Sequence, residues 1–201
     1  MADINYGTTL HFYRKNYRRK MHGFNHPFEL RADFIPLLED KKRVSIADLA
    51  SGPCSVIGSV YKDVKLHIYP SDILQKEYYE LWKEFGDEVP NIPIAYQDIE
   101  HLTYPDNHFD IVYCANSLDH TPEPQLALTH MVRVCKHGGY VYIRHAFRQR
   151  TLYKGMHQWD VEMENGECIF KQPGRKFYLK EFGDFKTHIE DKVAVSIMKK
   201  I

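Results

Sequence analysis

Several features that would place this chain in a special class are missing from its sequence. No apolar run is long enough for a membrane span, and residues 1–10 lack the apolar core of a signal peptide, so we expect no membrane insertion. No CxxC pair occurs among the four cysteines, Cys54, Cys114, Cys135 and Cys168. They predict free thiols in a reducing compartment, and we expect the cytoplasm.

The chain also lacks an excess of either charge. Lys and Arg together number 27, as do Asp and Glu, so the formal net charge is zero. Proteins that bind nucleic acid usually carry excess basic residues, which neutralise phosphates, so we expect no nucleic-acid partner. The basic cluster from Arg14 to Lys20 is either a patch for an anionic partner or the solvated face of a helix whose aromatic residues point inward.

Internal repeats, low-complexity tracts and Pro/Gly/Ser-rich linkers are absent as well. A length of 201 residues suits one compact domain with a single core. Residues 1–43 look helical, and from residue 44 onward strand and helix patterns alternate. We therefore expect a helical cap over residues 1–43 and an α/β unit over residues 44–201.

The alternation from residue 44 predicts a Rossmann-like, doubly wound α/β fold with helices on both faces of a mostly parallel sheet. The predicted parallel strands are Val44–Leu49, Leu66–Ser71, Ile92–Gln97, Phe109–Ala115 and Tyr140–His145. The predicted helices are Ile73–Phe85 and Pro124–Lys136. In the tail, Asn165-Gly166 predicts a hairpin between 159–163 and 167–171, and 193–198 a last strand. These tail strands predict an antiparallel hairpin at one edge.

Polar and small residues follow successive strands, where ligands bind in open α/β sheets. Asp48, Ala50 and Gly52 close the first strand, and small residues there let a ligand approach the backbone. Asp72 follows the second strand and could accept both hydroxyl protons of a ribose. Asp98 and Ile99 follow the third and could bind an adenine amine and ring nitrogen. A nicotinamide dinucleotide fits poorly, because the G-x-G-x-x-G register reads Ala50, Gly52 and Ser55.

At these strand ends the stretches ADLASGP, YPSDIL and YQDIEHLTYPDNHFDIVYCANSLDH resemble the class I S-adenosylmethionine-dependent methyltransferases, over Val44–Ile143. The resemblance implies S-adenosyl-L-methionine as cofactor, with contacts at Asp48, Ala50, Gly52, Asp72, Ile73, Asp98, Ile99 and Asn116. Ala50 and Cys54 depart from the usual glycines beside Gly52. This turn, NSLDH and GMHQWD are similar to a subgroup linked to polysaccharides and glycosyltransferases. That similarity implies O-methylation of a glycan such as a rhamnose, within a larger glycosyltransferase polypeptide.

A hydroxyl acceptor needs a base to remove its proton, and histidine suits that role near neutral pH. Three histidines lie at the predicted rim, and we rank them His145, His120 and His157. Asp119 could orient His120 or act as the base itself. We expect no metal, because the sequence has no HxH, HExxH or DxD spacing.

Two other functions fit the same pattern. One is a methyltransferase for an amine or hydroxyl of a small metabolite, and the other is an inactive cofactor-binding module. The Asn-Pro-Pro-Tyr motif of enzymes that methylate amide or nucleobase nitrogen is absent after the fourth strand, where Asn116-Ser-Leu-Asp119 stands. The aromatic-rich segment from Tyr153 to Trp159 is a candidate platform for a sugar ring, although Trp159 could equally belong to the core of the hairpin.

Overall fold

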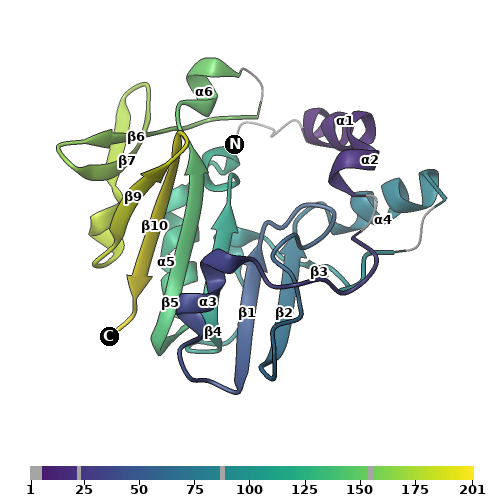
Figure 1. Cartoon of the computed structure of the whole chain (residues 1–201). Coiled ribbons are helices and arrows are strands. Elements are labelled where there is room, and N and C mark those ends of the chain that lie inside the picture. The colour runs from purple at the N-terminus through teal and green to yellow at the C-terminus, as the bar shows by residue number, and fades with distance from the viewer. Residues whose placement is uncertain (1–5, 22–23, 87–88, 154–155) are drawn as a thin grey trace.

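The computed structural model describes residues 6–21, 24–86, 89–153 and 156–201. Within these ranges, seven strands form one sheet in the order β3-β2-β1-β4-β5-β10-β9 (Figure 1). Their bounds are β1 Arg43–Leu49, β2 Lys65–Asp72, β3 Ala95–Tyr96, β4 Phe109–Ala115, β5 Cys135–Ala146, β9 Lys186–Glu190 and β10 Val193–Lys199. Along this order, the first five strands (β3, β2, β1, β4 and β5) pair in parallel, whereas β10 is antiparallel to both β5 and β9. The predicted mostly parallel sheet with antiparallel strands at one edge is confirmed, but the hairpin at that edge consists of β9 and β10.

Helices cover both faces of this sheet, as the sequence predicts. On one face, α5 (Pro124–Val134) buries Leu128 and Met131 in a cluster with residues of β1, β4 and β5. Its buried positions recur at the spacing of a helix that packs one face on a core. On the other face, the 3₁₀ turn η1 (Ala32–Phe34) and α3 (Ile35–Leu38) bury Phe34 against the same strands.

The helix α4 (Gln75–Glu84) matches the predicted helix, whereas β3 is shorter than predicted. Tyr78 and Leu81 of α4 are buried, as their spacing indicates. The strand expected over 92–97 contains only Ala95–Tyr96, and both residues are exposed. Ile94 is buried, because it packs with Tyr78 beside α4 and not in the sheet. The edge position of β3 explains why its apolar pattern overstated its length.

The boundary between α5 and β5 also differs from the prediction. The helix ends at Val134 and β5 begins at Cys135, so the predicted helix end at Lys136 and strand start at Tyr140 are both wrong. The register shifts here, since Phe109 pairs with Cys135 but Ile111 pairs with Tyr140. A Cβ on Gly139 would lie 2.7 Å from the Asp110 carbonyl oxygen. Gly139 therefore permits a close approach of two backbones inside an irregular strand.

The predicted hairpin forms, but in a second sheet. β6 (Asp160–Glu164), β7 (Glu167–Gln172) and β8 (Arg175–Tyr178) make this separate three-stranded antiparallel sheet. Asn165 and Gly166 both have positive φ, as a type I′ turn requires. Trp159 is fully buried and packs on Phe177 within the core cluster of α5. The Asn165-Gly166 turn could reveal the hairpin, but not which sheet it joins.

The helices α1 (Gly7–Lys15) and α2 (Tyr17–Lys20) lie beside α4 (Figure 1). Tyr17 is buried against Trp82, whereas Phe12 is exposed. Arg14 forms an ion pair with Glu84 of α4, with a shortest N–O distance of 2.8 Å. The basic cluster thus spans α1 and α2, whose tyrosines Tyr13 and Tyr17 pack inward, which supports the solvated-face interpretation.

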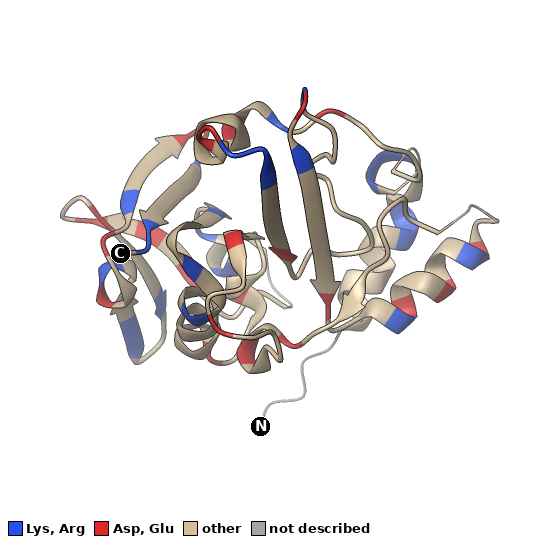
Figure 2. Cartoon of the chain, turned by 90° about the horizontal axis from the view of Figure 1, so that it is seen from below, with Lys and Arg blue, Asp and Glu red and all other residues tan. Residues whose placement is uncertain are grey.

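Other surface properties are ordinary. Acidic and basic residues are interspersed on the face that Figure 2 shows. The four cysteines are buried free thiols, as predicted. Within the described ranges, no helix is both long enough and apolar enough to cross a membrane.

The packing of α5 generates a stability prediction. Leu128 is fully buried, whereas Leu126 on the same helix is 37% exposed. Leu128→Ala removes buried methyl groups and leaves a cavity, so we expect it to lower the free energy of unfolding by about 2–5 kcal/mol. The matched control Leu126→Ala should cost less than about 1 kcal/mol, since exposed substitutions have small effects. Denaturant titrations of both variants measure this difference, and equal losses would contradict the described face of α5.

Candidate functional site

The turn that follows β1 lies at the sheet's switch point, where the strand order reverses between β1 and β4. Ala50 and Gly52 both have positive φ, at 50° and 72°. The Gly52 N–H donates to Asp72 Oδ2 at 2.9 Å, and the Leu74 N–H donates to Asp72 Oδ1 at 2.9 Å. The carboxylate at the end of β2 therefore holds the turn after β1 in place. Each of its oxygens keeps a second lone pair for a ligand.

Two of the predicted cofactor residues are buried carboxyl groups. Burial raises the pKa of Asp48 to about 7. Burial also raises the pKa of Asp72 to about 6, and its hydrogen bonds from backbone N–H groups oppose this rise. A group with two backbone donors and little exposure is suited to hold a polar ligand rather than to face solvent.

The remaining predicted cofactor residues also lie at strand ends. Asp98 accepts a 2.9 Å hydrogen bond from the Glu100 N–H and so caps the 3₁₀ turn η2 (Ile99–His101), in which Ile99 is buried. Asn116 follows β4 and accepts a 2.8 Å hydrogen bond from the Ala146 N–H at the end of β5. Ile73 is half-buried beside Tyr78. These residues border the same edge of the sheet as the turn after β1.

Two tyrosines that the sequence did not assign to the site lie across this edge. Tyr13 of α1 packs edge-to-face on Tyr78, and a Cβ on Gly52 would lie 2.6 Å from its hydroxyl oxygen. Burial and the nearby charge of Asp72 raise the pKa of Tyr13. Tyr6 precedes α1, and burial and the charge of Asp98 raise its pKa as well. The spacing of Tyr6 and Tyr13, with Leu10 between them, places them on one helix face and was the signal for this contact.

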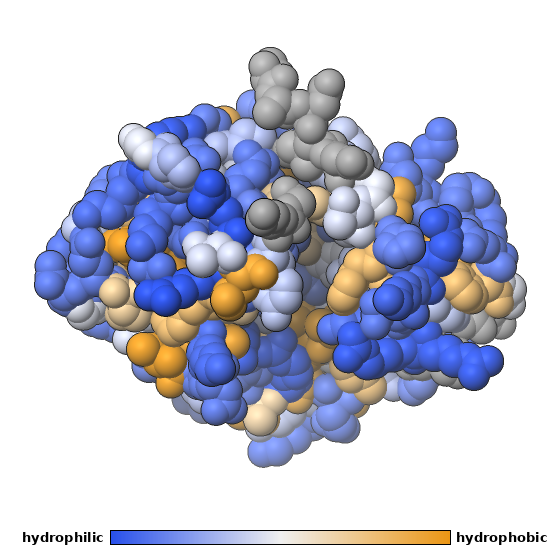
Figure 3. All heavy atoms as spheres, turned by 90° about the horizontal axis from the view of Figure 1, so that it is seen from above, coloured by the Kyte–Doolittle hydropathy of each residue, from blue (hydrophilic) through white to orange (hydrophobic). Residues whose placement is uncertain are grey.

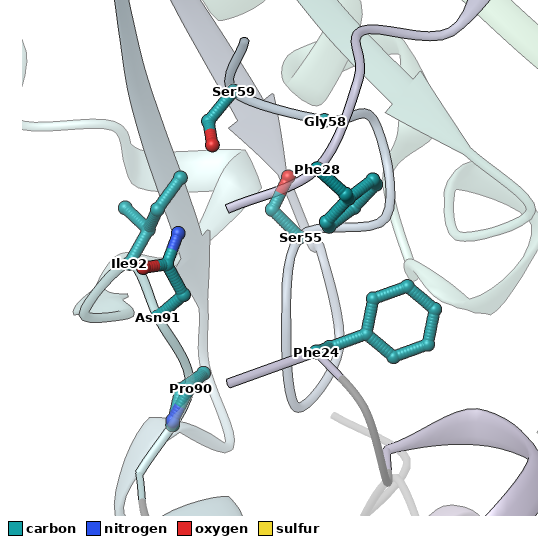
Figure 4. Close-up of a pocket in the computed structure, with 8 residues that line it drawn as sticks. All are labelled: Phe24, Phe28, Ser55, Gly58, Ser59, Pro90, Asn91 and Ile92. Carbon is teal, nitrogen blue, oxygen red and sulfur yellow. The ribbon is translucent and has the colours of Figure 1, made fainter. Parts of the chain in front are cut away.

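S-adenosyl-L-methionine fits the chemistry of these residues. Asp72 offers carboxylate lone pairs for a ribose diol, and Gly52 lets the backbone approach a ligand without a Cβ. Seen from above, a furrow separates the surface over α6 (Gln149–Leu152) from the surface over α1 and α4 (Figure 3). A separate small pocket behind the turn is lined by residues such as Phe24, Phe28 and Ser55 (Figure 4). Its lining holds no titratable side chain, so we assign it no chemistry.

The three candidate bases converge on Asp119, next to the cofactor residues. Asp119 and His120 lie in the 3₁₀ turn η3 (Leu118–His120) after β4, His145 lies in β5, and His157 precedes β6. His157 Nδ1 is 2.5 Å from Asp119 Oδ2. The Nε2 atoms of His145 and His120 lie 3.2 Å and 3.5 Å from Asp119 Oδ1.

Backbone contacts hold this histidine–carboxylate cluster in place. The Gln158 N–H donates to the Asp119 carbonyl at 2.7 Å, which ties the segment before β6 to η3. Trp159 Nε1 donates to the Thr121 carbonyl at 3.1 Å. Ser117 Oγ donates to the Ala50 carbonyl at 3.1 Å, which joins η3 to the turn after β1. The cluster and the cofactor residues therefore belong to one edge.

The members of the cluster differ in how much of each side chain is exposed to solvent. The side chains of Asp119 and His145 are 1% and 2% exposed, whereas those of His120 and His157 are 27% and 22% exposed. Although burial alone would raise it, the surrounding imidazoles lower the pKa of Asp119 below its usual range. Burial lowers the pKa of His120, which favours its neutral form.

The segment from Tyr153 to Trp159, predicted as a candidate surface for stacking on a sugar ring, begins with an exposed residue and ends with a buried one. Trp159 is fully buried in the core, so its use as a stacking surface is wrong. Tyr153 is 58% exposed, and its ring centroid lies 6.2 Å from that of His157. Lys154 and Gly155 of this segment lie outside the described residues. Tyr153 is the exposed aromatic residue beside the cluster.

The role of Asp72 can be tested directly. Asp72→Ala removes the carboxylate that we expect to accept ribose hydroxyls, together with its hydrogen bond from the Gly52 N–H. Charge-assisted hydrogen bonds are worth about 1.5–3 kcal/mol, so the affinity for S-adenosylmethionine should fall about tenfold or more. Asp184→Ala, at an exposed carboxylate distant in sequence, is the matched control and should bind normally. Calorimetric titration of a folded Asp72→Ala variant that gave unchanged affinity would refute this role.

Comparison with known proteins agrees with this site. Residues 47–143 match the family described as "Methyltransferase domain". An "Uncharacterized methyltransferase" from Schizosaccharomyces pombe is 33% identical over 114 residues, which cover 53% of this chain and 41% of that protein. A "Ubiquinone/menaquinone biosynthesis C-methyltransferase" from a Shewanella species is 27% identical over 158 residues, which cover 76% of this chain and 54% of that protein. The chain thus spans about half of these relatives, or less.

A solved structure has the same fold. A candidate S-adenosyl-L-methionine-dependent methyltransferase from Methanococcus maripaludis superposes with a TM-score of 0.57 at 15% identity, over 96% of this chain and 92% of that one. The family match contains the turn after β1, Asp72, Asp98 and the cluster residues of η3. Over residues 47–143, the chain therefore matches the methyltransferase family, and this match implies S-adenosylmethionine as the cofactor.

Proposed function

We propose that this protein transfers a methyl group from S-adenosylmethionine to a hydroxyl group of a sugar in a glycan, with rhamnose as the first candidate. The observation that carries the proposal is the histidine–carboxylate cluster at the same edge as the cofactor residues. A sugar hydroxyl becomes a competent nucleophile only when its proton can leave, so a base beside the acceptor is what this reaction requires. The cluster offers two half-buried imidazoles for that purpose.

His120 is the first candidate for the base. S-adenosylmethionine, when bound, supplies a methyl group on a sulfonium, and displacement breaks the C–S bond as the C–O bond forms. His120 in its neutral form takes the acceptor's proton on a ring nitrogen. Asp119 stays ionised beside it and stabilises the imidazolium that results. His157 is the second candidate, since it is similarly exposed and contacts the same carboxylate.

His145, ranked first from the sequence, fits a different role. Its side chain is 2% exposed and packs on the ring of Phe170, so an acceptor has little access to it. The Asp119 N–H points to His145 Nε2 at 3.3 Å. We assign His145 the positioning of Asp119, and we rank His120 and His157 before it.

The acceptor side supports a glycan in one respect. An exposed aromatic ring beside the base suits stacking on a sugar ring, and Tyr153 lies there. An acceptor carbon is the second candidate, because one relative is named a C-methyltransferase. We further propose that residues 1–43 form a helical cap over the unit 44–201, since Tyr13 lies on Gly52. A place within a larger glycosyltransferase polypeptide also remains part of the proposal.

The base assignment yields a prediction for turnover. With an alkyl rhamnoside as acceptor, His120→Ala should lower kcat about 10²–10⁴-fold, because the base acts on the proton in the transition state. Binding of S-adenosylhomocysteine should stay within about twofold of the unmodified protein, since the cofactor residues are untouched. His188→Ala, at an exposed histidine of β9, is the control and should keep full activity.

His157→Ala is assayed in parallel. If both His120→Ala and His157→Ala keep rates close to that of the unmodified protein, a histidine base is wrong. If no sugar hydroxyl is methylated while a quinol carbon is, the proposed acceptor is wrong.

A further inference from the structure

The histidine–carboxylate cluster brings together three metal-ligating side chains. Asp119, His120 and His157 each offer one ligand atom, and these atoms lie within 4.8 Å of one another. His120 and His157 are 37 residues apart in the sequence. No short spacing motif can reveal such a set, which explains why no metal was expected from the sequence.

One buried carboxylate oxygen in the cluster lacks a hydrogen-bond donor or cation that would balance its charge. Asp119 Oδ1 is buried and has no hydrogen-bond partner among the described residues. His145 Nε2 lies 3.2 Å away, but it accepts the Asp119 N–H, so in that arrangement it carries a lone pair towards the oxygen. An ionised oxygen beside a lone pair is unfavourable in a buried site unless a cation or proton lies close by.

The two half-buried histidines likewise have too few N–H groups to donate to all the polar atoms that they contact. His120 Nε2 and His157 Nδ1 lie 3.0 Å apart, while His157 Nδ1 also lies 2.5 Å from Asp119 Oδ2. A neutral imidazole has one N–H, and that of His157 cannot point at both partners. The ring nitrogens and the carboxylate thus face a common region that is rich in lone pairs.

We propose that Asp119, His120 and His157 bind one divalent transition-metal ion of the Zn²⁺ type. Two imidazoles and a carboxylate are a ligand set that Zn²⁺ accepts, whereas Mg²⁺ prefers oxygen ligands alone. Tetrahedral ligands on Zn²⁺ lie roughly 3.3 Å apart, given Zn–N bonds of about 2.0–2.1 Å. His120 Nε2 lies 3.0 Å from His157 Nδ1 and 3.5 Å from Asp119 Oδ1, and both separations are close to that value. The exposure of the two histidines gives the ion a route from solvent.

Metal binding has a consequence that rests on the proposed function. A ring nitrogen that ligates Zn²⁺ has no lone pair for the acceptor's proton. Zn²⁺ therefore inhibits methyl transfer, while a chelator leaves the activity of the metal-free protein unchanged. The binding itself does not depend on the proposed function, so the two can fail separately.

The test uses the tag-free chain after removal of metal by a chelator. Calorimetric titration with Zn²⁺ should show one site of 1:1 stoichiometry that Mg²⁺ in excess does not displace. His120→Ala and His157→Ala each remove one ligand and should weaken that site at least tenfold. The matched control is His188→Ala, which removes an exposed histidine paired with Glu190 at 3.0 Å and should leave the site intact. Co²⁺ in place of Zn²⁺ should give visible absorption that the two ligand variants lose.

The outcomes separate the claims. If Zn²⁺ binds the unmodified protein no more tightly than it binds His120→Ala and His157→Ala, the metal site is refuted. If Mg²⁺ displaces Zn²⁺, the ligand assignment is likewise refuted. If Zn²⁺ binds as described but methyl transfer continues at its full rate, the metal site stands and the histidine base falls.

Discussion

The arrangement of the candidate site depends on one constraint, which is the parallel pairing of five neighbouring strands in the sheet, β3, β2, β1, β4 and β5. Parallel strands present their carboxyl ends at one edge, so residues far apart in the sequence meet there. Asp72 at the end of β2, Asn116 after β4 and His145 in β5 reach the same edge for this reason. The hydrogen bond from the Gly52 N–H to Asp72 then joins the turn after β1 to the end of β2. Without this pairing, neither the cofactor residues nor the cluster would be assembled.

Within that edge, the burial of Asp119 organises the acceptor side. A buried carboxylate is costly unless it is paired, and three imidazoles surround this one. Its backbone carbonyl also accepts N–H groups from the segment before β6, which brings His157 to the same place. The same electron-rich arrangement that can accept a proton can also accept a transition-metal ion. The proposed base and the proposed metal site thus rely on the same lone pairs of Asp119, His120 and His157.

Much of this arrangement could be predicted from the sequence, because local patterns indicate where strands and helices lie along the chain. The alternation of elements predicted the sheet, and the residues predicted to bind the cofactor lie together at one edge of it. Tertiary contacts set the rest. The buried state of His145 depends on Phe170 in the second sheet, and the position of Tyr13 over Gly52 depends on how α1 packs on α4. The early start of β5 depends on a register shift opposite Phe109, which no periodicity indicates.

The measurement that tests the central claim most directly is the position of the transferred methyl group in the product. The protein is incubated with ¹³C-methyl-labelled S-adenosylmethionine, an alkyl rhamnoside and a quinol as the competing acceptor, and the products are analysed by NMR. Our account predicts a labelled methyl ether on one hydroxyl of the sugar and no labelled carbon on the quinol. A label on the quinol carbon with no ether on the sugar would contradict it.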